Sequence, residues 1–387
     1  MKILHVVGAR PNFMKIAPII EAIADHAAQG ASPNIEQRLV HTGQHYDEVM
    51  SKLFFEDLGI PRPDINLEVG SGSHGQQTGR IMEAFEKVLL EEKPDLVLVV
   101  GDVNSTMACA IDSKKLCIPV AHVEAGLRSR DMTMPEEVNR IVTDTISDLL
   151  FTTDLGANVN LRSEGVPEAR IHFVGNVMID SLMKHRDKAL ALLTLERLGL
   201  KDMGAVVPYA VVTLHRPANV DDPDVLRGIS KALVELGEKM RVVFPMHPRT
   251  KKQIEGFGLE QMFSVNRNIY VVAPMGYLDF LNLTANASMV LSDSGGIQEE
   301  TTILGVPCLT LRPNTERPIT IEQGTNMLVG NDPDAIISAI ELVTNKERSL
   351  SRVPALWDGK AAKRIVQVID HWFRYHEGSV QGLPKWQ

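Results

Sequence analysis

The chain alternates short runs of apolar, often β-branched residues with longer segments of helical periodicity. The run Lys2–Gly8 is almost continuously apolar, as expected of a strand that is buried on both faces of a sheet. Helical patterns follow such runs, for example at Met14–His26 and Gln77–Glu92. Because alternation of this kind places successive strands in parallel, the sequence predicts an α/β fold built on doubly wound parallel sheets.

The strand pattern begins a second time in the C-terminal half. The expected strands lie within 2–8, 38–43, 95–102, 119–126, 149–153 and 170–176, and then within 209–217, 241–249, 268–274, 289–296 and 306–313. A length of 387 residues suits two domains. We therefore expect two Rossmann-like domains, at 1–175 and 176–365, that face a cleft. Residues 366–387 are expected to form a C-terminal helix that packs back on the first domain.

Composition narrows the range of partners. The net charge of −9 argues against a nucleic-acid groove. No apolar run reaches the ~18–20 residues that a membrane span needs, and the N-terminus lacks the pattern of a signal peptide. The three cysteines form no CxxC pair and are expected to be buried thiols in a reducing compartment. We expect a cytoplasmic protein with no nucleic-acid or membrane partner.

The segment Asp293–Glu300 follows an expected strand and opens a helix. Its small residues let backbone amides approach a phosphate, and the helix N-terminus adds partial positive charge. Glu300, one turn further on, could accept hydrogen bonds from ribose hydroxyls, and Arg317 follows the next strand as a nearby cation. A simple capped turn is the alternative for the segment alone. Together these features predict a site for a nucleotide diphosphate.

Arg10 and Lys15 flank the start of the first expected helix. Cations there oppose the helix dipole, so an anion is expected between them, with two solvated surface charges as the alternative. Further along, Gly70–Gly75 matches GxGxxG without closing the first strand–helix turn of a dinucleotide-binding unit. We interpret it as a flexible loop near the substrate and expect no nicotinamide cofactor.

Carboxylates are the most informative side chains. Asp102 and Glu124 end two expected strands, where no structural rule asks for a carboxylate, and Glu136 and Glu137 lie at a helix start. For Glu137 a role as cap or dipole complement is favoured. Converging carboxylates suit acid–base catalysis, because mutual repulsion and burial separate their pKa values.

Two arginines and two histidines complete the set of candidate residues. Arg128 and Arg140 are candidate counter-ions of the carboxylates. His215 and His247 also end expected strands, but their spacing matches no HExxH or other zinc pattern. Contacts to phosphate or sugar are therefore expected, with a metal hydrolase as the alternative.

Seven motifs, in unbroken order over residues 1–330, together resemble the non-hydrolysing UDP-N-acetylglucosamine 2-epimerase family. They are Gly8–Lys15, 41–45, 101–106, 122–128, 135–140, 292–300 and 315–318. The resemblance implies the glycosyltransferase-B fold, a homodimer, and interconversion of UDP-N-acetylglucosamine and UDP-N-acetylmannosamine without a metal or other cofactor.

The resemblance also implies roles for individual residues. The catalytic set falls on Asp102, Glu124, Glu136 and His215, and the substrate-positioning cations on Arg10 and Lys15. The uridine and phosphate contacts fall on Ser294, Gly295, Gly296 and Glu300, with Arg317 nearby. Arg128, Arg140 and His247 complete the expected substrate-binding residues.

The chemistry of such a reaction agrees with these residue types. The C2 proton of an N-acetylhexosamine is not next to a carbonyl, so direct deprotonation is slow, whereas elimination of UDP across C1–C2 carries the charge away. That route needs carboxylates as acid and base, cations that hold the departing diphosphate, and closed lobes that retain the intermediate. Alternatives are an epimerase of a related sugar such as a UDP-2,3-diacetamido uronate, a hydrolysing epimerase, a glycosyltransferase, and a UDP-sugar sensor without activity.

Turnover of the UDP-sugar is expected to survive EDTA. The phosphate contacts are assigned to amides, arginine and lysine, so chelation of divalent ions should leave the rate unchanged. The measurement is the rate of epimerisation before and after dialysis against EDTA. Loss of the rate, and its recovery with a divalent ion, would contradict the assignment.

Overall fold

The computed structural model describes residues 1–29, 35–43, 59, 61–345 and 352–376. The chain divides into two compact units, one formed by Met1–Ser181 with Ala355–Gln387 and the other by Leu182–Pro354. The first division falls inside helix α7 (Val177–Leu190) rather than at 175/176, and the chain re-enters the first unit at 355 rather than 366. Helical periodicity continues through such a division, so only contacts locate it.

The first unit is built on a seven-stranded parallel sheet. Its strands are β1 (Lys2–Val7), β2 (Glu36–His41), β3 (Ile65–Asn66), β4 (Leu96–Val100), β5 (Val120–Ala125), β6 (Leu149–Thr152) and β7 (Ile171–Phe173). They lie in the order β3-β2-β1-β4-β5-β6-β7. The residues of β4 and β5 are all buried, which explains their continuous apolar runs.

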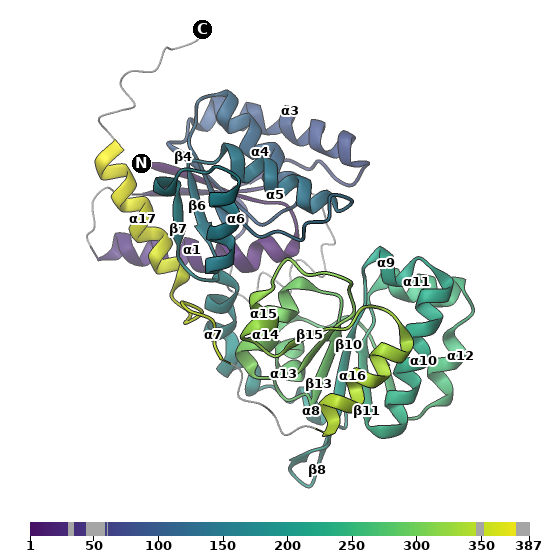
Figure 1. The fold of residues 1–387 in the computed structure, drawn as a ribbon. Helices are drawn as coiled ribbons and strands as arrows, with labels where there is room; N and C mark the ends of the chain where they lie inside the picture. The colour runs from purple at the N-terminus through teal and green to yellow at the C-terminus, as the bar shows by residue number, and fades with distance from the viewer. Residues whose placement is uncertain (30–34, 44–58, 60, 346–351, 377–387) are drawn as a thin grey trace. The chain divides into compact units, whose positions relative to one another are not determined.

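Helices cover both faces of this sheet. They are α1 (Arg10–Ala28), α3 (His74–Glu92), α4 (Asn104–Lys115), α5 (Pro135–Ile146), α6 (Leu155–Ser163) and α17 (Ala361–His376), with a short 3₁₀ turn at Glu168–Arg170. α3 and α4 bury Ile81, Phe85 and Ala108 against β1 and β4. α17 packs along α1, so the last described helix joins the unit that begins the chain (Figure 1).

The returning segment is fastened by specific contacts. The indole Nε1 of Trp357 donates to the Thr153 carbonyl at 2.9 Å, and Asp180 accepts hydrogen bonds from the backbone amides of Ala361 and Ala362 at the start of α17. Gly175 has φ +90°, and a Cβ there would lie 2.1 Å from the Leu356 carbonyl oxygen. A glycine is therefore required for this close approach.

The second unit repeats the same strand order. Its strands are β10 (Tyr209–Thr213), β11 (Arg241–Pro245), β12 (Ile269–Val272), β13 (Met289–Ser292), β14 (Cys308–Thr310) and β15 (Asn326–Leu328), in the order β12-β11-β10-β13-β14-β15. A small hairpin, β8 (Lys201–Asp202) and β9 (Ala205–Val206), lies outside this sheet.

Two apolar clusters cover the faces of the second sheet. The helices are α8 (Thr194–Arg197), α9 (Pro217–Val220), α10 (Pro223–Lys239), α11 (Pro248–Gly256), α12 (Glu260–Val265), α13 (Tyr277–Ala285), α14 (Gly295–Leu304), α15 (Ile319–Glu322) and α16 (Pro333–Asn345). α10, α12 and α16 bury their apolar sides against Val212, Phe244 and Leu291, while Leu283 of α13 packs with Val211 on the other face. Both units therefore have the Rossmann-like arrangement.

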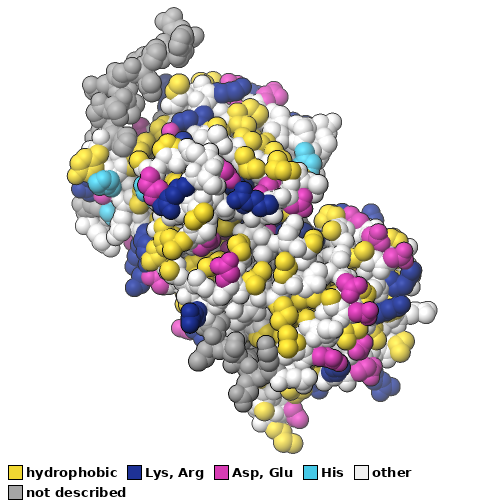
Figure 2. Space-filling model, in the orientation of Figure 1, with side chains coloured by type: hydrophobic (Ala, Val, Ile, Leu, Met, Phe, Trp, Pro, Cys, Tyr) yellow, Lys and Arg dark blue, Asp and Glu magenta, His cyan; other side chains and the backbone are white. Residues whose placement is uncertain are grey.

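Three surface properties bear on the composition arguments. Over the described residues, no helix is long and apolar enough to cross a membrane. Basic and acidic side chains are interspersed on the face shown in Figure 2. Cys109 and Cys308 are buried, but Cys117 is exposed, contrary to expectation, because it follows α4 in a turn with φ +59°.

Gly175→Ala is expected to destabilise the protein more than Gly165→Ala. Both glycines have positive φ, but nothing lies within 4 Å of a Cβ at Gly165. The control should lose only the conformational term, about 1–2 kcal/mol, whereas Gly175→Ala should lose about 1–3 kcal/mol more through the clash with Leu356. Urea unfolding measures both, and equal losses would contradict the role assigned to the close approach.

Candidate functional site

Asp102 lies just after β4 and is held by α5. Arg140 donates from Nε and Nη2 to Asp102 Oδ2 at 3.0 and 2.7 Å, and Asn139 Nδ2 donates to the Asp102 carbonyl at 2.9 Å. The Arg140 side chain is buried, whereas that of Asp102 is 28% exposed. Arg140 is therefore the counter-ion of a carboxylate that still reaches the surface of its unit.

Glu124 is held in an unusual backbone conformation. It has φ +70° inside β5, where the pairing with β6 shifts register between Val123 and Ala125. Non-glycine residues rarely adopt this region, and such conformations are frequent at functional sites. Its Oε2 bonds Lys15 Nζ, while its buried Oε1 has no hydrogen-bond partner among the described residues. One oxygen of this buried carboxylate is thus left without a hydrogen-bond partner among the described residues.

Lys15 is a buried partner of Glu124 and not a surface cation. A Cβ at Gly101, which has φ +70°, would lie 2.9 Å from Lys15 Nζ, so glycine lets the ammonium approach the end of β4. The sequence predicts an anion between Arg10 and Lys15. The anion that Lys15 contacts is the carboxylate of Glu124. α1 begins at Arg10, but the Arg10 side chain lies outside the described residues, as do residues 44 and 45 of the second motif.

The two glutamates at the start of α5 differ in their surroundings. Glu136 is half-buried and precedes Asn139 and Arg140 by three and four residues, so it shares the helix face that contacts Asp102. Glu137 is fully buried, accepts hydrogen bonds from Ser129 N and Arg130 N at 3.0 and 2.9 Å, and pairs with Arg140. Glu137 lies on the first turn of α5, as expected of a dipole complement, and it also fixes the preceding loop and the counter-ion of Asp102.

Arg128 is not the counter-ion of these carboxylates. Its buried guanidinium pairs with Asp144 at 2.7 Å and with Glu164 at 2.6 Å, which accounts for its charge within the unit. Asp144 was absent from the sequence prediction. It lies seven residues after Glu137 and four after Arg140 on α5, and this helical spacing of charged residues in an amphipathic helix is the signal that marks it.

The loop Gly70–Gly75 is bonded to its neighbours. Ser73 caps α3, Gln77 Nε2 donates to the Gly70 carbonyl at 3.1 Å, and Asn104 Nδ2 donates to Gln77 Oε1 at 2.8 Å. Asn104 in turn contacts Asn139 beside Asp102 at 3.3 Å. Hydrogen bonds through Gln77, Asn104 and Asn139 connect the loop to Asp102. These bonds hold the loop in place, contrary to the expectation that it is flexible.

In the second unit, His215 follows β10 and is oriented by Asp293 after the adjacent β13. Nδ1 lies 2.8 Å from Asp293 Oδ1, and Asp293 also accepts the amides of His215 and Arg216. Burial opposes ionisation of Asp293, but bonding to His215 outweighs it and lowers the pKa of that carboxyl. His215 is 39% exposed, and no described residue bonds its Nε2. Sequence reasoning missed Asp293, although it too is a carboxylate at a strand end.

His247 and Arg317 are engaged differently from the expected substrate contacts. His247 is exposed, and its Nδ1 accepts the Arg249 amide at 3.2 Å, which caps α11; its ring centroid is 5.8 Å from that of His215. Arg317 is buried and pairs with Glu299 at 2.7 Å and with Glu316. Its charge therefore already has two carboxylate partners.

The start of α14 combines small residues with this arginine. A Cβ at Gly295 would lie 2.5 Å from Arg317 Nη1, so glycine allows the guanidinium to approach the helix N-terminus. Ser294 occupies the N-cap position without a side-chain capping bond, and Gly296 follows on the first turn. The first amides of α14 are the donors that a phosphate would use there.

Glu300 lies on the second turn of α14 and is buried. Burial raises its pKa to about 7, and the neighbouring Glu299 carboxylate adds to the rise while the Tyr277 hydroxyl opposes it. A carboxyl in this position is a hydrogen-bond partner for hydroxyl groups in either protonation state.

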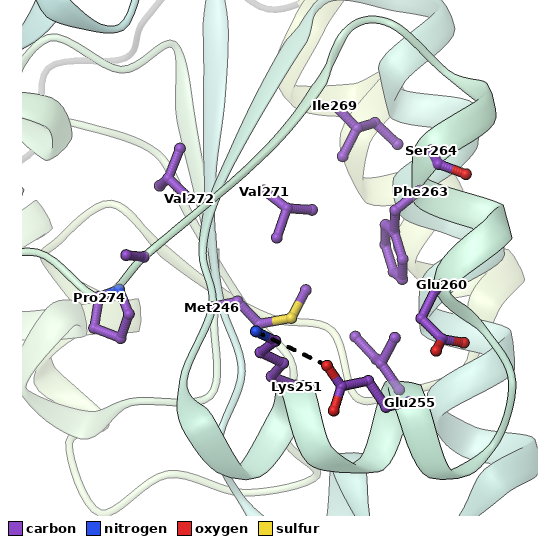
Figure 3. A pocket seen from close by; sticks show the side chains of 12 residues that line it. Met246, Lys251, Glu255, Glu260, Phe263, Ser264, Ile269, Val271, Val272 and Pro274 are labelled. Carbon is purple, nitrogen blue, oxygen red and sulfur yellow. Dashed lines mark ion pairs between the residues drawn. The ribbon is translucent and has the colours of Figure 1, made fainter.

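A cavity of about 540 Å³ opens elsewhere in the second unit, between β12, α11 and α12 (Figure 3). Met246, Phe263, Ile269 and Val271 supply an apolar lining, and Lys251 pairs with Glu255 at 3.9 Å beside it. None of the candidate residues lines it. Among the described residues there is also no cluster of three or more metal-ligating side chains.

Comparisons with known proteins agree with one another. The profile of the UDP-N-acetylglucosamine 2-epimerase family matches residues 27–370. The chain is 43% identical to a Methanocaldococcus jannaschii UDP-N-acetylglucosamine 2-epimerase, over 96% of this chain and 99% of the relative. It is 41% identical to a Pseudomonas aeruginosa UDP-2,3-diacetamido-2,3-dideoxy-D-glucuronate 2-epimerase, over 95% and 99%. The M. jannaschii enzyme solved with UDP-GlcNAc and UDP superposes with a TM-score of 0.87, over 96% of this chain and all of the other, at 43% identity.

Glu300→Gln is expected to remove a pH dependence of stability. The folded-state pKa of about 7 exceeds the ordinary value of 4.5, so between these values the folded state binds more protons. The contribution of Glu300 to stability is therefore present below pH 4.5 and lost as the pH rises through 7, by roughly 3 kcal/mol.

Urea unfolding at several pH values measures the difference between the wild-type protein and the variant. Glu322→Gln, at an exposed glutamate of α15, is the control. A difference between wild type and Glu300→Gln that stays constant from pH 4.5 to 8 would contradict the shift.

Proposed function

The chain belongs to the UDP-N-acetylglucosamine 2-epimerase family and has its glycosyltransferase-B fold, and on that basis we propose that it is an isomerase that interconverts UDP-N-acetylglucosamine and UDP-N-acetylmannosamine. The observation that carries the proposal furthest is the Glu124 carboxylate, which is buried and strained. Lys15 bonds one of its oxygens, and the other has no hydrogen-bond partner among the described residues. A group held in this way can exchange a proton with a bound ligand without first breaking a contact of its own.

The first unit supplies the acid and base groups. In the forward direction a base removes the C2 proton, the C1–O bond to UDP breaks with its electron pair leaving on UDP, and 2-acetamidoglucal forms. A proton then reaches C2 from the opposite face, and UDP adds again at C1. We assign these proton transfers to Asp102, Glu124 and Glu136, because the first two end neighbouring strands and Glu136 shares the α5 face that contacts Asp102.

The second unit supplies groups for the nucleotide. The amides at the start of α14, at Ser294–Gly296, would bind the diphosphate, and Glu300 would accept the ribose hydroxyls. His215 is assigned a catalytic role, because Asp293 fixes its Nδ1 and leaves Nε2 for the substrate. Arg317 acts through its position beside Gly295 rather than as an isolated cation.

Two further proposals follow from the family resemblance and the thiols. We expect a homodimer, which light scattering on the purified protein tests directly. We also expect the protein to act in the cytoplasm, because all three cysteines, including the exposed Cys117, are free thiols, as is usual in a reducing compartment. Fluorescent tagging in cells tests this location.

A second candidate substrate has specific support. The identity to the UDP-2,3-diacetamido-2,3-dideoxy-D-glucuronate 2-epimerase, 41%, is close to the 43% found for the UDP-N-acetylglucosamine enzyme. The same elimination would apply, since both sugars carry the acetamido group at C2. Parallel kinetics with the two UDP-sugars separates the candidates through kcat/KM.

Asp102→Asn, Glu124→Gln and Glu136→Gln are each expected to lower the epimerisation rate by ~10²–10⁴-fold, because each removes an ionisable group and keeps its shape. UDP affinity should change little, since the nucleotide contacts are assigned to other residues. In D2O, the product of the wild-type enzyme should carry deuterium at C2.

NMR of the sugar product and calorimetry with UDP make both measurements. Glu168→Gln is the control, because Glu168 pairs with Arg162 at the surface, away from the carboxylates. Retention of protium at C2, at both partial and full equilibration, would rule out elimination.

A further inference from the structure

A buried imidazole connects the two strand ends that carry Asp102 and Glu124. His122 lies in β5, two residues before Glu124, and is fully buried. Its Nε2 is 2.8 Å from the carbonyl oxygen of Gly101, and its Nδ1 is 2.7 Å from Asp144 Oδ1. Both ring nitrogens face acceptors, so the ring donates in two directions.

Asp144 extends this connection to the other side of Glu124. Its Oδ2 accepts the Gly126 amide at 3.0 Å and pairs with Arg128 at 2.7 Å. Burial opposes ionisation of Asp144, but the charges of His122 and Arg128 outweigh it and lower the pKa of that carboxyl. One ionised carboxylate therefore holds residues on both sides of Glu124.

Glu124 needs such support. It has φ +70° at the point where the β5–β6 pairing shifts register, and regular strand pairing would relax this conformation. Gly126, with φ +80°, packs so closely that a Cβ there would be 2.5 Å from the Ala157 carbonyl oxygen. The backbone on that side is thus fixed both by packing and by Asp144.

We propose that His122, anchored by Asp144, is a positioning residue that sets Asp102 and Glu124 relative to each other. Through Nε2 it holds the Gly101 carbonyl, which precedes Asp102, and through Nδ1 it holds β5 on both sides of Glu124. The inference rests on the proposed function, in which these two carboxylates move protons at the same sugar carbon.

His5 provides a matched control for a merely structural role. It is equally buried in the same sheet, in β1, and its Nε2 bonds Gln37 at 2.9 Å. Burial lowers its pKa to about 4, and it contacts neither Gly101 nor Asp144. Replacing His5 therefore removes a buried, hydrogen-bonded imidazole without touching the two carboxylate turns.

Two substitutions separate the two arms of His122. The asparagine amide nitrogen can occupy the place of Nδ1, so His122→Asn keeps the bond to Asp144 and loses that to Gly101. The glutamine amide reaches the place of Nε2, so His122→Gln does the reverse. Each is expected to lower kcat by about 10- to 100-fold, since a displacement of ~1 Å at reacting groups has this effect, with KM changed less than about threefold.

His5→Asn should lower the melting temperature about as much as the His122 variants do, with kcat unchanged. Crystal structures of the His122 variants give a readout that does not depend on turnover. In them Glu124 is expected to leave φ +70°, or the Gly101–Asp102 turn to shift.

The outcomes distinguish this inference from the proposed function. A wild-type protein that epimerises neither UDP-sugar refutes the function, and the crystal structures then still decide the positioning. The positioning role would be overturned if both His122 variants kept the kcat of the wild-type protein, or if His5→Asn lost as much kcat as they do. It would also be overturned if the backbone at Glu124 and Asp102 were unchanged in the crystal structures of the His122 variants.

Discussion

The strand order that both sheets share determines where the candidate site residues lie. In a doubly wound parallel sheet the strand order reverses once, between two adjacent strands. The loops that follow these two strands run to opposite faces of the sheet, so a crevice forms at their carboxyl ends. In the first unit these strands are β1 and β4, followed by the turns near Lys15 and Asp102. In the second they are β10 and β13, followed by His215 and Asp293. Each pair is brought together only by this reversal.

Burial of charge is the second constraint on these edges. A charge removed from water is costly unless an opposite charge and hydrogen bonds compensate for it. Lys15 therefore pairs with Glu124, Arg140 with Asp102 and Glu137, and Arg317 with Glu299 and Glu316. Several cations that look from the sequence like substrate contacts are the partners of carboxylates. Two atoms of the candidate residues, the buried Glu124 Oε1 and the partly exposed His215 Nε2, keep no hydrogen-bond partner among the described residues.

The two units use their carboxylates in different electrostatic settings. In the first unit Asp102 and Glu124 each have a cation within hydrogen-bond range, Arg140 and Lys15 respectively. In the second unit no cation of the described residues pairs with Glu300, which adjoins Glu299 and has a pKa raised by burial to about 7. The first arrangement suits proton transfer to and from a carbon, and the second suits hydrogen bonds to neutral hydroxyls.

The sequence by itself determined the α/β class, most strands and the candidate carboxylates. Strands buried on both faces read as continuous apolar runs, and polar residues stand out where those runs end. The two- and three-residue strands β3 and β15 were too short to show a pattern. Which charges pair was decided by tertiary structure, since Lys15 and Glu124 lie 109 residues apart and the strand order alone joins them. The positive φ of Glu124 and the place of the unit boundary within α7 likewise follow from packing and register, which no local pattern encodes.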